Sequence, residues 1–162
     1  QEDSASGGKY TLQCSRPNES VKLWVQLRLN GLEPYREKLR LALSNAQLLW
    51  TMINSDAYPQ FRSLHTSPPQ FTNCCFWFVR DPALYDEFIE DGDLFRPSDA
   101  VAEQVGRTTE EVRAKVMADR RVFVAFASIT EWAVPSFFRA VIINRVGRPE
   151  LEAILQEIIK HS

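Results

Sequence analysis

The segment that most restricts the fold is an apolar run in the middle of the chain, Phe71–Val79, with the sequence FTNCCFWFV. A strand with one buried face alternates apolar and polar residues, whereas this run is aromatic or apolar almost throughout. We therefore expect a strand that is covered on both faces and lies in the middle of a sheet. Its adjacent cysteines, Cys74 and Cys75, should point to opposite faces.

A second apolar segment contains an arginine. The sequence PSFFRAVIIN begins at Pro135 and predicts a strand over 137–143. Alternate residues of a strand share a face, so Arg139 should point the same way as Phe137 and Val141. An unpaired buried guanidinium is costly, so Arg139 needs either an anion or an exit to water. The residues alone leave open whether Arg139 has a structural role or grips a ligand carboxylate.

Capping residues and apolar periodicity predict helices around these strands. The helices are expected over 20–29, 35–53 and 109–119, with a last one that begins near Pro149. The first should stop at Gly31 and the third should open with a Thr cap. In the second, the period places Leu39 on the buried face and Asn45 off it. Shorter extended segments are expected over 10–14, 61–66 and 122–127. This order predicts an α+β fold, a small antiparallel sheet with helices packed on one face.

The remaining segments are expected to be connections. Residues 1–9 are polar and small, as in a linker or a cut loop, and 10–162 should form one domain. Residues 80–106 turn acidic and predict a surface excursion, and 129–136 predicts a loop. Periodicity predicts burial of Trp24, Trp50 and Trp77, whereas Trp132 should fix its own loop or line a pocket.

Composition narrows the class of protein. The 162 residues are 44% hydrophobic, which is enough for a real core, and the formal net charge of -2 is spread along the chain. This balance favours neither a nucleic-acid partner nor an anionic membrane, and no apolar run predicts a membrane span. The chain does not begin with Met, so we expect a piece of a longer protein.

Three cysteines are an odd number, which predicts no disulfide framework and a reducing, cytoplasmic setting. His65 and His161 are far apart in the sequence and no CxxC spacing occurs, so no metal site is expected. No glycine loop for phosphate is present. Cys74 and Cys75 are expected to fill a core rather than to act as nucleophiles.

Three blocks, taken in order, resemble a known family. They are LQCSRPNESVKLW from Leu12, FTNCCFWFV from Phe71 and SFFRAVIIN from Ser136. Together they resemble the carboxy-terminal part of the pyridoxal-phosphate-dependent group II amino-acid decarboxylases, with the glutamate and cysteine sulfinate decarboxylases most similar. The resemblance covers the chain from about residue 10 to its end.

The resemblance implies a small carboxy-terminal α+β domain of a fold type I enzyme, which closes over the active site of a homodimer. It implies a large domain that holds pyridoxal 5'-phosphate on a lysine, and an L-amino acid as substrate, with acidic and sulfinic amino acids as candidates. Arg139 matches the family arginine that grips a substrate carboxylate. Arg16 matches a second family position, with an active-site or interface role as one candidate and a structural ion pair as the other.

Departures from the family limit these expectations. The sequence contains no His-Lys pair, so the part that carries the cofactor is missing and the chain alone should be inactive. Ser15 replaces a family glycine, and the segment before the FFR block differs, which leaves the substrate open. The alternative is a non-catalytic α+β binding or oligomerisation module that keeps the family fold.

Overall fold

The computed structural model describes residues 19–122, 124–143 and 146–162, so the predicted segments 1–9 and 10–14 and Arg16 lie outside the described residues. The chain divides into two compact units, Gln1–Glu37 and Lys38–Ser162. In the first unit, α1 (Glu19–Asn30) ends at Gly31 as predicted, because Gly31 adopts a φ of 71° and donates its N–H to the Leu27 carbonyl. Trp24 was expected to be buried but is 61% exposed, since the apolar residues of α1 are spread around the helix rather than along one stripe.

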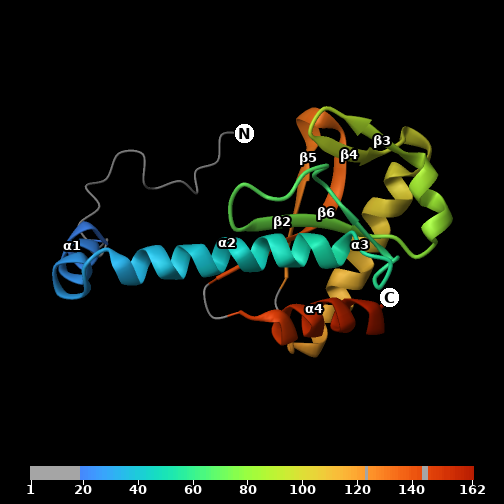
Figure 1. Ribbon diagram of the computed structural model, residues 1–162. Helices are drawn as coiled ribbons and strands as arrows, with labels where there is room; N and C mark the ends of the chain where they lie inside the picture. Colours follow the sequence, from blue (N-terminus) through green and yellow to red (C-terminus); the bar gives the residue numbers. More distant parts are fainter. Residues whose placement is uncertain (1–18, 123, 144–145) are drawn as a thin grey trace, which may run out of the picture. The chain divides into compact units, whose positions relative to one another are not determined.

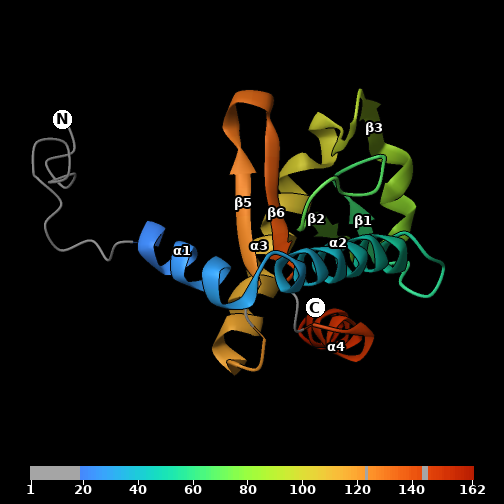
Figure 2. The same ribbon diagram turned by 60° about the vertical axis from the view of Figure 1, so that its left-hand side comes forward.

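The second unit is built on a four-stranded antiparallel sheet in the order β1-β2-β6-β5. Its strands are β1 (Phe61–Ser63), β2 (Asn73–Phe78), β5 (Ala125–Ile129) and β6 (Val134–Val141). The apolar run therefore forms a central strand, as predicted. The predicted strand with the arginine forms the other central one, a place that the sequence analysis had not assigned. Figure 2 shows β5 and β6 side by side as a long hairpin.

The turn of this hairpin is shorter than the loop predicted over 129–136. A single 3-10 turn, η2 (Thr130–Trp132), reverses the chain, and Ala133 follows it in the left-handed region with a φ of 51°. Pro135 has no N–H to give to a ladder, and the pairing of β5 with β6 shifts register between Ala127 and Ile129. The bulge accommodates the proline and lets β6 begin at Val134.

Three helices pack on one face of the sheet, which confirms the predicted α+β architecture. They are the second half of α2 (Glu33–Ile53), α3 (Asp99–Asp119) and α4 (Arg148–Lys160), seen beside the central strands in Figure 1. Pro149 lies in the first turn of α4, as expected. None of the described helices has both the length and the apolar character that crossing a bilayer requires.

The opposite face of the sheet is covered by a second, smaller layer, where the sequence predicted only a surface excursion with one short helix. The acidic segment forms a 3-10 helix, η1 (Pro82–Glu87), and a two-stranded sheet of β3 (Phe88–Asp91) and β4 (Leu94–Pro97). Two backbone hydrogen bonds hold this layer to the chain after β1: Phe95 donates to Leu64 over 2.8 Å, and Thr66 donates to Asp93 over 3.1 Å. An apolar cluster that includes Trp77 and Phe137 fills the space beneath it.

Helix α3 begins at Asp99, not near Thr109 as predicted. A threonine at the start of the predicted segment was expected to cap the helix, but Thr108 and Thr109 are both buried within it. Gly106 lies inside the helix and serves the packing: a Cβ atom there would lie 3.1 Å from the Cβ of Pro135. The missing side chain thus lets α3 lie close against the start of β6.

Helix α2 differs from its prediction at two positions. Asn45 was placed off the buried face, but it is buried and its side-chain amide donates to the Val146 carbonyl. A buried backbone carbonyl in the segment before α4 needs such a donor. Leu39 was placed on the buried face but is exposed, because the buried positions of α2 begin only at Ala42.

Candidate functional site

The candidate site is built around Arg139 in β6, a strand that is paired on both sides. The Cα partners of Arg139 are Cys75 in β2 and Ala125 in β5. Both neighbours are small, so neither side chain covers the guanidinium, and Arg139 is exposed. Phe137, on the same face, is buried, whereas Val141 is 52% exposed. Arg139 therefore stands where the covered half of this face meets an open half.

Among the described residues, no carboxylate neutralises Arg139. Within the part of the chain that the structure describes, no ion pair or side-chain hydrogen bond involves it. Of the two solutions expected from the sequence, the structure therefore has the exit to water. A guanidinium with free donors on a rigid strand is able to bind an external carboxylate through two parallel hydrogen bonds.

The open half of the face is apolar apart from Arg139 and Asn73. Pairing continues beyond β6, because Ile142 donates its N–H to the Thr72 carbonyl over 2.9 Å. Val141, Ile143 and Phe71 each leave more than half of their surface exposed. Apolar side chains grouped around one cation are typical of a surface that meets another part of a protein.

A cavity of about 590 Å³ lies next to this open half. Asn73 lines it and is the diagonal cross-strand neighbour of Arg139, with Cα atoms roughly 7 to 8 Å apart for such pairs. Trp132 also lines it, so the structure shows this side chain at a pocket rather than only against its own loop. The other lining residues are His65, Ser67, Pro68, Pro69, Gln70, Phe71, Asp91, Asp93 and Leu94.

The titratable groups of the cavity are acidic or weakly basic. They are Asp91, Asp93 and His65, and Arg139 is not among the lining residues. Asp91 is paired with Arg96, whose Nε lies 3.4 Å from its carboxylate. The cationic Arg139 and the cavity are therefore neighbours with opposite charge preference.

The two cysteines of β2 point to opposite faces, as predicted, and neither is a nucleophile. Cys74 packs in the cluster under the helices and Cys75 in the cluster under the second layer. Burial raises the pKa of Cys74 to about 12, and the nearby Cys75 adds to the effect. Burial also raises the pKa of Cys75 to about 11, although the charge of Arg139 opposes it. Both thiols stay protonated at neutral pH, which argues against cysteine chemistry.

Sequence reasoning found Arg139 but missed most of the cavity. His65, Asp91 and Asp93 were not predicted as site residues. A signal was present in the pair Gly92-Asp93, a two-residue hairpin turn with Gly first between two short apolar runs, and Gly92 has a φ of 64°. That signal would have predicted the β3–β4 hairpin. The structure places its turn beside the chain after β1, where Thr66 donates its N–H to the Asp93 carbonyl.

The comparisons with known proteins agree with the resemblance expected from the three blocks. The sequence is 25% identical over 152 residues to the acidic amino acid decarboxylase GADL1 of Mus musculus, covering 93% of this chain and 25% of the relative. The same protein of Xenopus tropicalis is 22% identical over 153 residues, covering 93% of this chain and 27% of the relative. The chain thus spans about a quarter of the relatives it matches. No protein-family model matches the sequence.

Solved structures share the fold. Mouse CSAD in its apo form superposes with a TM-score of 0.69 at 18% identity, over 93% of this chain and 29% of that one. Oryza sativa TDC, solved with PLP and tryptamine, superposes with a TM-score of 0.62 at 16% identity, over 86% of this chain and 25% of that one. The α+β unit described above is therefore the fold of the carboxy-terminal part of such decarboxylases.

Proposed function

We propose that this chain is the carboxy-terminal small domain of a pyridoxal-phosphate-dependent amino-acid decarboxylase. In this proposal it helps to close the active site and orients the substrate through its carboxylate. Similarity to acidic amino acid decarboxylases over 93% of the chain supports the class of enzyme. The single observation that carries the site is the exposed guanidinium of Arg139, which is held in a central strand and has no partner among the described residues.

Arg139 is well suited to hold a carboxylate in a fixed direction. Its backbone is fixed by hydrogen-bonded strands on both sides, and its side chain stands between the small residues Cys75 and Ala125. A bidentate guanidinium then defines both the position and the plane of the bound carboxylate. Such positioning lowers the entropy lost on the way to the transition state.

The described residues do not by themselves fit pyridoxal phosphate. The cofactor needs a lysine for its covalent link, and the residues that line the cavity beside Arg139 include none. Two aspartates in that lining, Asp91 and Asp93, would also repel the phosphate group. In the proposal the cofactor is therefore bound mainly by the large domain of the same protein, and this chain contributes only to binding and orienting the substrate.

The open apolar half of the sheet face supports a domain junction at this place. Val141, Ile143 and Phe71 are exposed around Arg139, and burying them against the large domain would remove apolar surface from water. The anchor would then lie at the edge of a cleft between the domains. We propose an amino acid as the small-molecule partner, with acidic and sulfinic ones as candidates, and a cytoplasmic homodimer as the assembly.

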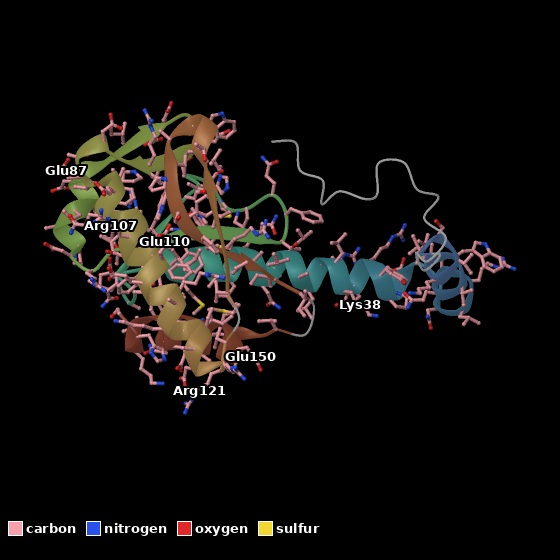
Figure 3. All side chains as sticks on the ribbon, turned by 180° about the vertical axis from the view of Figure 1, so that it is seen from behind. Lys38, Glu87, Arg107, Glu110, Arg121 and Glu150 are labelled. Atoms are coloured by element: carbon pink, nitrogen blue, oxygen red, sulfur yellow. The ribbon has the colours of Figure 1, made fainter. Side chains whose placement is uncertain are left out.

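The test is a pair of substitutions at Arg139 in the intact protein, Arg139→Met and Arg139→Lys. Methionine keeps the bulk but removes every donor, so kcat/KM for the best amino-acid substrate should fall by about 100-fold, which corresponds to ~3 kcal/mol for a charged bidentate contact. Lysine keeps the charge without the fork and should lose about tenfold. The control is Arg107→Met, which removes an exposed arginine of α3 that pairs with Glu103 (Figure 3).

Unchanged kcat/KM in Arg139→Met would overturn the role of Arg139 and leave the enzyme class standing. The enzyme class is tested separately, by release of carbon dioxide from acidic and sulfinic amino acids and by the visible absorption of bound pyridoxal phosphate in the purified protein. A protein that shows neither would instead be the non-catalytic binding or oligomerisation module.

A further inference from the structure

Three side chains with metal-ligating atoms meet where α3 and α4 end, away from the cavity and Arg139. Asp119 is the last residue of α3, whereas Glu157 and His161 stand four residues apart at the end of α4. His161 Nε2 lies 3.2 Å from Asp119 Oδ2 and 3.1 Å from Glu157 Oε1, and all three donor atoms lie within 4.8 Å of one another. Among the described residues this is the one group of three such ligands that is so close.

The spacing of these atoms matches a coordination shell. A tetrahedral ion with bonds of 2.0 Å places neighbouring donor atoms roughly 3.3 Å apart. The two distances from His161 are close to this edge length without any movement of the backbone. A single imidazole N–H, by contrast, is able to serve only one of the two carboxylates fully.

We propose that Asp119, Glu157 and His161 form a binding site for a divalent transition-metal ion, with Zn²⁺ as the ion that fits best. One imidazole nitrogen and two carboxylate oxygens leave the fourth position of a tetrahedral ion to water. The imidazole disfavours Mg²⁺ and Ca²⁺, which prefer oxygen ligands throughout. The inference is independent of the proposed decarboxylase function.

The local charges identify the competitors of a metal ion, because two cationic side chains already balance the two carboxylates. Lys160 Nζ lies 3.2 Å from Asp119 Oδ2 and 2.8 Å from Glu157 Oε1, so its ammonium group sits against both carboxylates. Arg121, labelled in Figure 3 just after α3, places its Nε 3.3 Å from Asp119 Oδ2. Hydrogen bonds from Lys160 first, and then those with Glu157 and His161, lower the pKa of Asp119 to about 2. The carboxylate is thus ionised at neutral pH, and a metal ion binds by displacing the ammonium.

The site is held by the core beneath it. The side chains of the three ligands are only 14% to 30% exposed. Behind them Val116 of α3 packs in one cluster with Leu155 and Ile158 of α4, which fixes the two helix ends relative to each other. Metal binding should therefore clamp α3 to α4 and stabilise the folded state.

Sequence reasoning expected no metal site because it looked for histidines and cysteines at short spacings. Here the partners His161 and Asp119 are 42 positions apart and meet only through helix packing. The fold therefore brings together three ligands that no local sequence motif predicts.

The experiment measures Zn²⁺ binding to the purified protein by titration calorimetry at pH 7.5, with the melting temperature recorded with and without the metal. We expect one Zn²⁺ per chain and a higher melting temperature. His161→Gln should weaken binding at least tenfold, because it removes the only nitrogen ligand of the three. Lys160→Met should strengthen it several-fold, because it removes the competing cation. Glu152→Gln, which changes a surface carboxylate of the same helix paired with Arg148, should leave it unchanged.

The two main variants should change the Zn²⁺ affinity in opposite directions, which distinguishes a metal site from a purely structural network of ion pairs. Such a network predicts no Zn²⁺-dependent heat in the parent protein and a lower melting temperature in both Lys160→Met and His161→Gln, and this result would overturn the proposal. If His161→Gln does not fold, the visible spectrum of Co²⁺ bound to the parent still decides: tetrahedral absorption supports the site, and a spectrum of free Co²⁺ refutes it.

Discussion

The two faces of the four-stranded sheet carry different tasks. The face under α2, α3 and α4 buries Phe76, Phe78 and Phe138 without interruption, and no charged residue is part of its cluster. The opposite face buries Trp77 and Phe137 under the β3–β4 layer, and then opens at Arg139. One face therefore stabilises the unit, whereas the other is only partly used for stability and keeps a cation available.

The largest expected effect comes from the fully covered face. Phe138→Ala removes a ring that is stacked on Phe76 and fully buried, and it should lower the free energy of unfolding by about 3 to 5 kcal/mol. Val141→Ala, three positions along the same strand but on the open half, should change it by less than about 0.5 kcal/mol. Urea unfolding followed by circular dichroism measures both. Equal losses would show that the open half is packed in solution.

A smaller effect is expected in the layer that covers the other face. Gly92→Val places a β-branched side chain at a φ of 64° in the β3–β4 turn and should destabilise that hairpin by about 1 to 2 kcal/mol. Gly92→Asn is the matched control, because Asn tolerates this conformation. Hydrogen exchange at the Phe95 amide, which donates to Leu64, reports the loss locally. If the helix amides lose protection equally, the layer is part of the main cooperative unit.

The reactivity of the two cysteines, one on each face of the sheet, gives a chemical comparison of the two faces. With pKa values of about 12 for Cys74 and about 11 for Cys75, the thiolate fraction differs by about tenfold, or ~1.4 kcal/mol. In a Cys14→Ser background, a disulfide reagent at pH 8 should therefore label the folded protein slowly, and Cys75 faster than Cys74. Equal rates would mean that labelling follows global unfolding rather than the local environment.

The smallest effect concerns the ends of α3 and α4. The folded pKa of Asp119 is lowered to about 2, so the stability that its carboxylate contributes is fully present above the unfolded pKa of about 4 and is lost as the pH falls toward 2. Asp119→Asn should flatten the stability profile in this window and leave the rest unchanged. Urea midpoints measured from pH 2 to pH 6 without added metal check this. A parallel displacement of the whole curve would contradict it.

The sequence predicted most of the fold because its strongest patterns are local. The continuous apolar run of β2 and the Pro149 start of α4 needed no information from distant residues. The failures depend on contacts that are distant in the sequence. The packing role of Gly106 was missed because its reason, the nearness of Pro135, lies in another strand. Asn45 was misplaced because its hydrogen-bond acceptor, the Val146 carbonyl, is far along the chain.

The candidate site also has a part that local patterns predicted and a part that depends on contacts distant in the sequence. Strand alternation placed Arg139 on its face, and energetics required either an anion or an exit to water, of which the structure has the second. Its proposed ligand came from resemblance rather than from physics. The cavity was missed because it is formed where three separate segments meet, the chain after β1, the β3–β4 turn and Trp132.

The contact between Gly106 and Pro135 has a consequence for how this protein is able to change through evolution. With only 3.1 Å between a Cβ at position 106 and the Cβ of Pro135, the two positions share one fixed volume. A larger residue at 106 is compatible with the same distance between helix and strand only if the residue at 135 becomes smaller. Across related chains the residues at these two positions should therefore covary. Their covariation would indicate the contact, which neither position indicates alone.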